Sequence, residues 1–441
     1  MARKAATLPK GTRLTDLISL GVLTQYVPLR KVDEALEATQ RQSQRHRQLP
    51  ARVMVYYVLA LALYMEVNYG EVLRCLVEGL ARLGLPVQRL RQSARSSISQ
   101  ARRRLGSEPL KLLYETLAIP AATREQTQGA WYRQWRLVSV DGSTLDLPDT
   151  AQNEATFGRP GASRGQSGFP QLRFVSLVEN GTHILFGARV GGYRMSEAQL
   201  AQEVLDQLQP DMLCLADRGF FSYSLWQRAT QTEAGLVWRV KSNLILPVRQ
   251  RLSDGSYLSQ IYPSAQHRRL DQAGIWVRVI EYRLEGIEDA EPLYRLVTNL
   301  LEGQAAPAAE LAALYHERWE IESAFDELKT HLRGRQIVLR SKTPELVLQE
   351  FYGLLLAHFA VRSLMHEAAL QGKVDPDELS FVHAVRVVKR KLPTLLAIPP
   401  SAQPRPPRGR ARRDPGGPSQ LQPRPPQPPG HQAKSQQVSH P

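Results

Sequence analysis

The chain has 441 residues, of which 42% are hydrophobic and 22% are charged, and this composition predicts a folded protein of two or three domains. Its two cysteines, Cys75 and Cys214, are too few and too far apart for a disulfide framework or a zinc-binding pattern, which favours a reducing cytoplasm. No secretory signal opens the chain, and its most apolar run, residues 53–65, is too short to span a bilayer.

The net charge of +15 is concentrated at the two ends of the chain. Residues 1–130 carry +10 and residues 399–441 carry +6, whereas the middle is nearly neutral. Basic ends around a balanced middle favour a polyanionic partner, above all nucleic acid. The alternative is that an arginine-rich composition follows the composition of the genome.

Residues 12–120 are predicted to be helical, because apolar residues recur in them at helical spacing. Residues 1–130 are therefore expected to form an all-helical N-terminal domain that binds DNA. One of its helices, residues 96–106, carries three consecutive arginines and ends at Gly106. Arg102, Arg103 and Arg104 could bind phosphates, or they could form a solvated helix face.

The middle of the chain reads as strands and then as strands alternating with helices. Three β-rich runs come first, and two further strands follow that alternate with two helices. This order predicts a mixed sheet with helices on its faces, and an RNase H-like α/β core is the simplest match. The strands are expected at 135–147, 172–179, 182–192, 211–217 and 234–240, and the helices at 196–208 and 222–230.

The remaining segments complete a five-part organisation. The first part of the RNase H-like catalytic core is expected over residues 131–240, and a β-rich insertion over 241–294. The second part of the core and the C-terminal helices follow over 295–395, with helices near 309–332 and 345–370. Residues 396–441 are rich in proline, glycine, glutamine and arginine and are expected to be a disordered tail.

Two aspartates stand at the ends of apolar runs. Asp141 follows "RLVSV" and precedes Gly142, a pattern that is often no more than a strand end or hairpin turn. Asp217 follows the strand "MLCLA", and in open α/β sheets ligands bind at the carboxyl ends of the strands. These positions make both aspartates candidates for chemistry.

A third acid comes from the stretch "YHERWEIESAFDELK", residues 315–329. At about 100° per residue, Tyr315, Arg318, Glu322 and Lys329 lie within about 60° of one another, beside an apolar stripe. On this reading Glu317, Glu320 and Glu327 face solvent, and Asp326 is a possible second acid on the polar stripe. A solvated charge stripe is the alternative for Glu322 taken alone.

Together, Asp141, Asp217 and Glu322 suit a pair of Mg²⁺ ions, which prefer carboxylate oxygens and are commonly shared with phosphate. Two such ions can activate a water or a 3′-hydroxyl and stabilise the leaving oxygen in phosphoryl transfer. Arg318 and Lys329 could neutralise phosphate charge, and Tyr315 could hydrogen-bond a phosphate.

At this point the chain resembles the bacterial insertion-sequence DDE transposases of family four. Their signature is Tyr, two residues, Arg, three residues, Glu, six residues and Lys, and Tyr315, Arg318, Glu322 and Lys329 match it without a gap. "VSVDGSTLDLPDT" looks like the family's first-aspartate segment, and "CLADRGFFSY" looks like its second. The resemblance covers roughly residues 12–390.

The resemblance implies roles for individual residues. Asp141, Asp217 and Glu322 would be the catalytic residues and ligate two Mg²⁺ ions, with Mn²⁺ as a substitute. Tyr315, Arg318 and Lys329 would contact the DNA of the transposon ends. Better-studied members of the family cut DNA through a hairpin intermediate and stack a flipped base on an aromatic residue of the insertion. Tyr294 fits that aromatic by its spacing to Thr298; Trp238 and Trp276 are rivals, and core packing is the alternative for all three.

The resulting hypothesis is a magnesium-dependent DNA transposase that cleaves at terminal inverted repeats and transfers the strands into target DNA. Its partners would be double-stranded DNA at the transposon ends and at the target, and a second copy of the chain in the synaptic complex. No membrane partner is expected, and the location would be the bacterial cytoplasm, at the nucleoid. Two alternatives remain, namely a DNA-binding relic without catalysis and a structure-selective nuclease. The Pro/Gln-rich end "KSQQVSHP" departs from the compact basic segment with which family members often finish.

Overall fold

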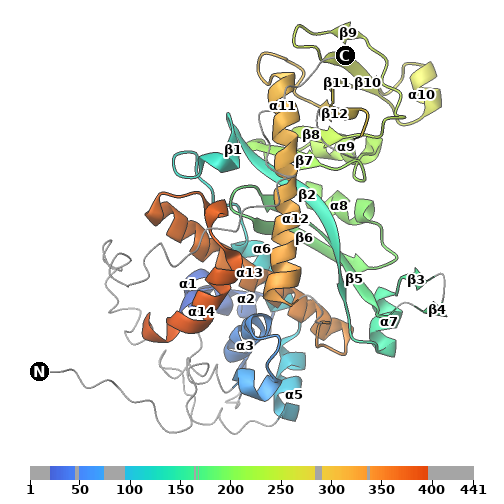
Figure 1. Ribbon diagram of the computed structural model, residues 1–441. Coiled ribbons are helices and arrows are strands. Elements are labelled where there is room, and N and C mark those ends of the chain that lie inside the picture. The colour runs from blue at the N-terminus through green and yellow to red at the C-terminus, as the bar shows by residue number, and fades with distance from the viewer. Residues whose placement is uncertain are drawn as a thin grey trace, which may run out of the picture. The chain divides into compact units, whose positions relative to one another are not determined.

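The computed structural model describes residues 20–44, 49–73, 95–162, 165–166, 168–283, 291–334 and 338–395. The predicted tail, residues 396–441, lies outside the described residues. The chain forms two compact units that do not follow chain order (Figure 1). Among the described residues, the first unit combines those from 20 to 118 with Glu327–Lys373 and Leu379–Leu395, and the second combines Ile119–Asp326 with Val374–Glu378.

The described part of the first unit is helical. Its helices are α1 (Leu20–Tyr26), α2 (Leu29–Ala38), α3 (Ala51–Leu63), α5 (Arg95–Leu105), α6 (Glu108–Leu117), the π-helix η5 (Glu327–Leu332), α13 (Pro344–Gly372) and α14 (Phe381–Leu395). The all-helical character predicted for the N-terminal region is thus confirmed within these limits. The predicted helix 96–106 corresponds to α5, and the predicted helix 345–370 corresponds to α13.

The helices α3 and α13 form the centre of the first unit. Every residue of α3 except Arg52 is buried, which explains why the run 53–65 is so apolar. The two helices approach closely at Gly353, where a β-carbon would lie 2.6 Å from a methyl group of Val58. No helix among the described residues meets the length and hydropathy needed to cross a membrane.

The second unit is built on a ten-stranded mixed sheet. Nine of its strands run in the order β6-β5-β2-β7-β8-β12-β11-β10-β9, and β1 pairs with β2 beside this path. The strands are β1 (Trp131–Tyr132), β2 (Trp135–Asp146), β5 (Gln171–Glu179), β6 (Ile184–Gly192), β7 (Met212–Ala216), β8 (Gly235–Arg239), β9 (Gln250–Arg251), β10 (Tyr257–Ile261), β11 (Ile275–Tyr282) and β12 (Tyr294–Thr298), with a separate pair of β3 (Gly161–Ala162) and β4 (Gly165–Gln166).

The strand directions agree with the predicted mixed α/β class. The strands β2, β5 and β6 form an antiparallel meander, whereas β7 pairs parallel to β2 and β8 pairs parallel to β7. The strands of the segment 241–294 join the same sheet, because β11 pairs with β12 and β12 pairs with β8, both antiparallel. The β-rich segment therefore extends the central sheet at its β8 edge.

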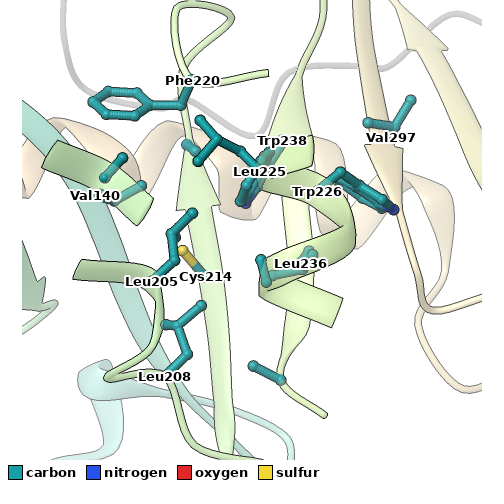
Figure 2. Close-up of a cluster of buried hydrophobic side chains, with 14 of the residues drawn as sticks. Val140, Leu205, Leu208, Cys214, Phe220, Leu225, Trp226, Leu236, Trp238 and Val297 are labelled. Carbon is teal, nitrogen blue, oxygen red and sulfur yellow. The ribbon is translucent and has the colours of Figure 1, made fainter. Parts of the chain in front are cut away.

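Helices cover both faces of the sheet. This arrangement buries the apolar side chains that the central strands present on both faces. On one face, α8 (Glu197–Leu205) and α9 (Tyr223–Thr230) pack against Cys214 and Ala216 of β7. Figure 2 shows this cluster, in which Trp226 of α9 meets Trp238 of β8 edge to face at a centroid distance of 5.3 Å. On the other face, α11 (Ala308–Leu314) packs against alternate strand residues such as Leu213.

The helix predicted near 309–332 is present, but its winding changes along its length. It runs as α11, then a 3₁₀ turn (Tyr315–Arg318), then α12 (Trp319–Asp326), and then the π-helix η5. Figure 1 shows α11 and α12 as one continuous rod in the second unit. The assumption of about 100° per residue therefore holds within α12 but not at Tyr315 or at Lys329.

Candidate active site

The register of the sheet brings Asp141 and Asp217 to neighbouring positions. The last paired residues of the parallel strands β2 and β7 are Val140 and Ala216, and each aspartate is the next residue of its chain. Asp141 continues in β2 and pairs with Ser176 of β5, while β7 ends at Ala216. Both aspartates thus lie where β7 and its pairing with β2 end, and ligands bind at the carboxyl ends of strands in open α/β folds.

The third acid, Glu322, lies on α12 and is linked to Asp141 through Arg318. The Arg318 guanidinium is 3.3 Å from Oδ2 of Asp141 and 3.2 Å from Oε1 of Glu322. Its side chain is only 11% exposed, whereas that of Glu322 is 43% exposed. The largely buried guanidinium of Arg318 therefore bridges Asp141 and Glu322, two of the three predicted carboxylates. The third predicted carboxylate, that of Asp217, directly follows the neighbouring strand β7.

The surroundings of Asp141 oppose its ionisation. Burial raises the pKa of the Asp141 carboxyl to about 6, and the negative charges of Glu197 and Glu322 act in the same direction. A 2.7 Å hydrogen bond from the Gly142 N–H to Oδ1 and the charge of Arg318 oppose this rise only in part. The site thus holds more negative charge than its own arginine balances.

Tyr315 lies against the end of β7 and not at the surface. It is 6% exposed, and its hydroxyl donates a 3.4 Å hydrogen bond to the carbonyl of Ala216. Burial raises the pKa of this hydroxyl well above its usual range, so Tyr315 stays neutral. Tyr315 is therefore placed to hold the strand end that carries Asp217.

Comparison with known families decides the class of this enzyme. The family described as "Transposase DDE domain" matches residues 134–360, and the family described as "Insertion element 4 transposase N-terminal" matches residues 17–115. A transposase of *Escherichia coli* (strain K12), InsG of insertion sequence element IS4, is 30% identical over 394 residues, which cover 88% of this chain and 86% of InsG. The chain belongs to the IS4 family of DDE transposases. It is accordingly a DNA-cleaving enzyme.

Two further comparisons are more distant. The putative transposase InsZ of the same *E. coli* strain is 25% identical over 224 residues, which cover 50% of this chain and 71% of InsZ. Among solved structures, the cryo-EM structure of the piggyBac transposase synaptic complex with hairpin DNA is similar at a TM-score of 0.45 and 11% identity. That match covers 88% of this chain and 82% of the piggyBac chain.

The donor set of this transposase fits a divalent cation, which a DDE domain uses. Asp141, Asp217 and Glu322 offer carboxylate oxygens, the ligands that Mg²⁺ and Mn²⁺ favour over the nitrogen and sulfur ligands typical of zinc. The raised pKa of Asp141 indicates a site that is electrostatically strained without a cation. A divalent ion would stabilise the ionised Asp141 carboxylate against its burial, which is the main cause of the raised pKa, and against the charges of Glu197 and Glu322.

The structure does not favour Tyr294 as a stacking platform for a base. Its ring stacks on Tyr282 at a centroid distance of 5.3 Å, and the guanidinium of Arg239 lies 4.6 Å from its centroid. Of the two rivals, Trp238 is fully buried in the core, whereas Trp276 on β11 is 46% exposed. Of these three aromatics, Trp276 alone therefore presents a largely accessible ring.

The three consecutive arginines of α5 divide by burial, and for Arg102 the predicted contact with DNA is wrong in this fold. Arg102 is 2% exposed and donates hydrogen bonds to Gln349, Ser341 and the carbonyl of Leu346, so that its guanidinium cannot reach a phosphate. Arg103 and Arg104 are exposed and stay candidates. Lys329, another predicted basic contact, is partly buried on η5 in the first unit.

Two of the three acids predicted to face solvent are in fact buried. Glu317 is exposed as predicted, but the side chain of Glu320 is only 13% exposed and accepts a hydrogen bond from the N–H of Gly181. Glu327 is 6% exposed, and its carboxylate pairs with Arg362 and lies 3.3 Å from Nε2 of His358. The prediction failed because helical periodicity shows only which residues share a side of the helix. It does not show whether other parts of the chain pack against the side opposite the apolar stripe.

Glu320 belongs to a second group of potential metal ligands that the sequence did not reveal. Nε2 of His183 lies 3.1 Å from Oδ1 of Asp377 and 3.7 Å from Oε2 of Glu320. Burial and the nearby charge of Asp377 raise the pKa of Glu320 well above its usual range. A bound cation would balance the negative charge of Glu320 and Asp377. Glu320 and Glu322 are two residues apart on α12, about 200° around the helix, so this group lies on a different side of the helix from Glu322.

Proposed function

We propose that this transposase cleaves DNA at the inverted repeats that end its element and transfers the cut strands into target DNA, with Mg²⁺ as cofactor and Mn²⁺ as a substitute. The observation that carries the proposal is the meeting of three carboxylates at one sheet edge. Asp141 and Asp217 follow paired residues on parallel strands, and Arg318 joins Asp141 to Glu322. On this proposal Asp141, Asp217 and Glu322 ligate the metal ions.

The strand order supports an RNase H-like core for this chemistry. An antiparallel meander of β2, β5 and β6, followed by β7 and β8 parallel to β2, is the arrangement expected of that core. The bound ions would supply an activated water or 3′-hydroxyl and charge neutralisation on the phosphate. The protein's own contribution is then to fix the carboxylates, since phosphoryl transfer asks mainly for positioning and electrostatic stabilisation.

Arg318 and Tyr315 hold the carboxylates in position. The planar guanidinium of Arg318 holds two carboxylates at once, which a flexible ammonium group would do less rigidly. The Tyr315 hydroxyl anchors the carbonyl that directly precedes Asp217. We assign both residues as positioning residues in the metal-free enzyme, because their burial leaves little of either side chain for DNA.

DNA contacts are assigned to basic groups that stay accessible. Arg103 and Arg104 on α5 are exposed, and the region that contains them matches the N-terminal family of IS4 transposases. We assign recognition of the element's ends to this region, and contact with the DNA near the cut to Lys329. Cleavage of two ends in one reaction further requires two copies of the chain on DNA, so the active species is a dimer.

A cleavage experiment tests the catalytic proposal. Wild type and Asp217→Asn are incubated with labelled end DNA in Mg²⁺, in Mn²⁺ and in EDTA. Wild type should nick the ends in either metal and not in EDTA, whereas Asp217→Asn should bind the same DNA without cutting it. Equal nicking by the two proteins would refute the assignment, and equal nicking of unrelated DNA of the same shape would point to a structure-selective nuclease.

A further inference from the structure

A fourth carboxylate, that of Glu197, borders the catalytic centre. Glu197 is the first residue of α8, whose start is fixed by a reciprocal capping box between Ser196 and Gln199. Residues three and four positions apart share a helix face, and Leu200 and Ala201 are buried against the sheet. The side chain of Glu197 is therefore on the face of α8 that points toward the sheet.

The contact that locates this carboxylate is with Gly142, the residue after Asp141. A β-carbon built on Gly142 would lie 2.5 Å from Cδ and 2.8 Å from Oε1 of Glu197. The carboxylate thus occupies the space that a side chain at position 142 would fill. Asp141 accepts its 2.7 Å hydrogen bond from the N–H of the same glycine. Gly142 thus has the Asp141 carboxylate at its N–H and the Glu197 carboxylate beside its α-carbon.

Nothing within the described residues neutralises Glu197. Its side chain is half-buried, and none of the ion pairs or side-chain hydrogen bonds of the described chain involves it. Arg318 is already shared between Asp141 and Glu322. With Asp217 on the adjoining strand, the centre therefore has four carboxylates and one guanidinium. Such an excess of oxygen ligands and negative charge matches two divalent cations better than one.

We propose that Glu197 is a fourth carboxylate of the metal centre and contributes directly to cation binding. The proposal rests on the metal-dependent cleavage proposed above and assigns a ligand that the transposase signature does not contain. It also gives Gly142 a role, because any larger residue there would displace the Glu197 carboxylate. The φ angle of Gly142 is not positive, so the requirement for glycine is one of space.

The test is Mn²⁺ binding to the full chain, measured by electron paramagnetic resonance and calorimetry, with cleavage of end DNA followed in parallel. Glu197→Gln should raise the Kd for Mn²⁺ about tenfold or more, in the range seen when groups around a metal site are replaced. The matched control is Glu203→Gln, since Glu203 lies on the same helix, is 70% exposed and pairs with Arg189. The control should bind Mn²⁺ as wild type does.

A second variant keeps the proposal testable if Glu197→Gln alters local packing. Gly142→Ala should also weaken Mn²⁺ binding, because the added methyl group pushes the Glu197 carboxylate aside. In the Glu197→Gln background the same change should add little, as expected for two changes that act through one contact. Tryptophan fluorescence and circular dichroism establish that each variant is folded.

The outcomes separate this proposal from the one on which it rests. A Kd for Glu197→Gln within twofold of wild type, while Asp217→Asn loses Mn²⁺ binding, would overturn the role of Glu197 and leave the catalytic proposal intact. Additive effects of Gly142→Ala and Glu197→Gln would likewise overturn it. Failure of the wild type to bind Mn²⁺ or to cleave end DNA would overturn both.

Discussion

Replacement of Asp141 by asparagine is expected to stabilise the metal-free enzyme while abolishing cleavage. Burial raises the pKa of Asp141 from 3.8 to about 6, so the folded protein resists the charged form that the unfolded chain accepts. Each pKa unit corresponds to about 1.4 kcal/mol, so the ionised carboxylate costs about 3 kcal/mol of unfolding free energy near neutral pH. Asparagine resembles the protonated acid and can still accept the hydrogen bond from Gly142.

The dependence on pH follows from the direction of the shift. Because the folded-state pKa is raised, the favourable contribution of Asp141 is fully present below about pH 3.8 and is lost as the pH rises through about 6. Asp141→Asn and wild type should therefore be nearly equal in stability at pH 4 and differ most at pH 8. Mg²⁺ should narrow the difference at pH 8, because it stabilises the ionised form of the wild type only.

Tryptophan fluorescence during urea denaturation is a suitable assay, since all six tryptophans lie in the second unit, which contains Asp141. The measurement is made in EDTA at pH 4.5, 6 and 8. The control Glu302→Gln changes an exposed acid of the same unit and should shift the unfolding free energy by less than about 0.5 kcal/mol. An Asp141→Asn protein no more stable than wild type at pH 8, or a stability gain that does not shrink in acid, would refute this reasoning.

Four further predictions concern charged residues of α5, α12 and η5. Arg102→Ala should lower the unfolding free energy by about 2–4 kcal/mol, followed by circular dichroism, because it leaves buried acceptors unsatisfied. Arg103→Ala and Arg104→Ala should instead leave stability unchanged and each reduce the slope of log affinity against log salt by about 1, measured by fluorescence anisotropy on end DNA. Glu327→Ala should cost about 3–5 kcal/mol, because Arg362 would be left buried without its partner; a loss under 1 kcal/mol would contradict this. Glu320→Gln should raise the urea midpoint at pH 8 but not at pH 4, since the raised pKa of Glu320 makes its ionised form unfavourable; equal midpoints at pH 8 would contradict it.

The sequence predicted those parts of the site that depend on strand order and local pattern. Asp141 and Asp217 each follow an apolar run, and parallel pairing of β2 with β7 places them side by side. Within α12 the period of about 3.6 residues correctly puts Arg318 on the same side as Glu322. These inferences hold because they need only the geometry of one helix and one pair of neighbouring strands.

Partners from distant parts of the chain could not be predicted in this way. From the sequence, Arg102 is indistinguishable from a surface arginine, but in the fold it is buried and donates hydrogen bonds to Gln349 and Ser341. Glu320 likewise resembles a solvated acid, but in the fold it lies beside His183 and Asp377. A charged residue on a helix shows only that some polar group is needed there. Whether that group is water, a phosphate or a buried side chain depends on elements hundreds of positions away.

The excess of negative charge around Asp141 distinguishes this proposed catalytic site from a structural network of ion pairs. In a cluster of carboxylates that serves only the structure, each acid would be expected to pair with its own basic side chain. Asp141 and Glu322 instead share the single guanidinium of Arg318. Such a cluster lowers the free energy of unfolding of the metal-free protein, as active sites commonly do. The stability gained by Asp141→Asn would then come mainly from removal of a buried charge, and the metal affinity lost by Glu197→Gln from removal of one of the carboxylates that bind the cation.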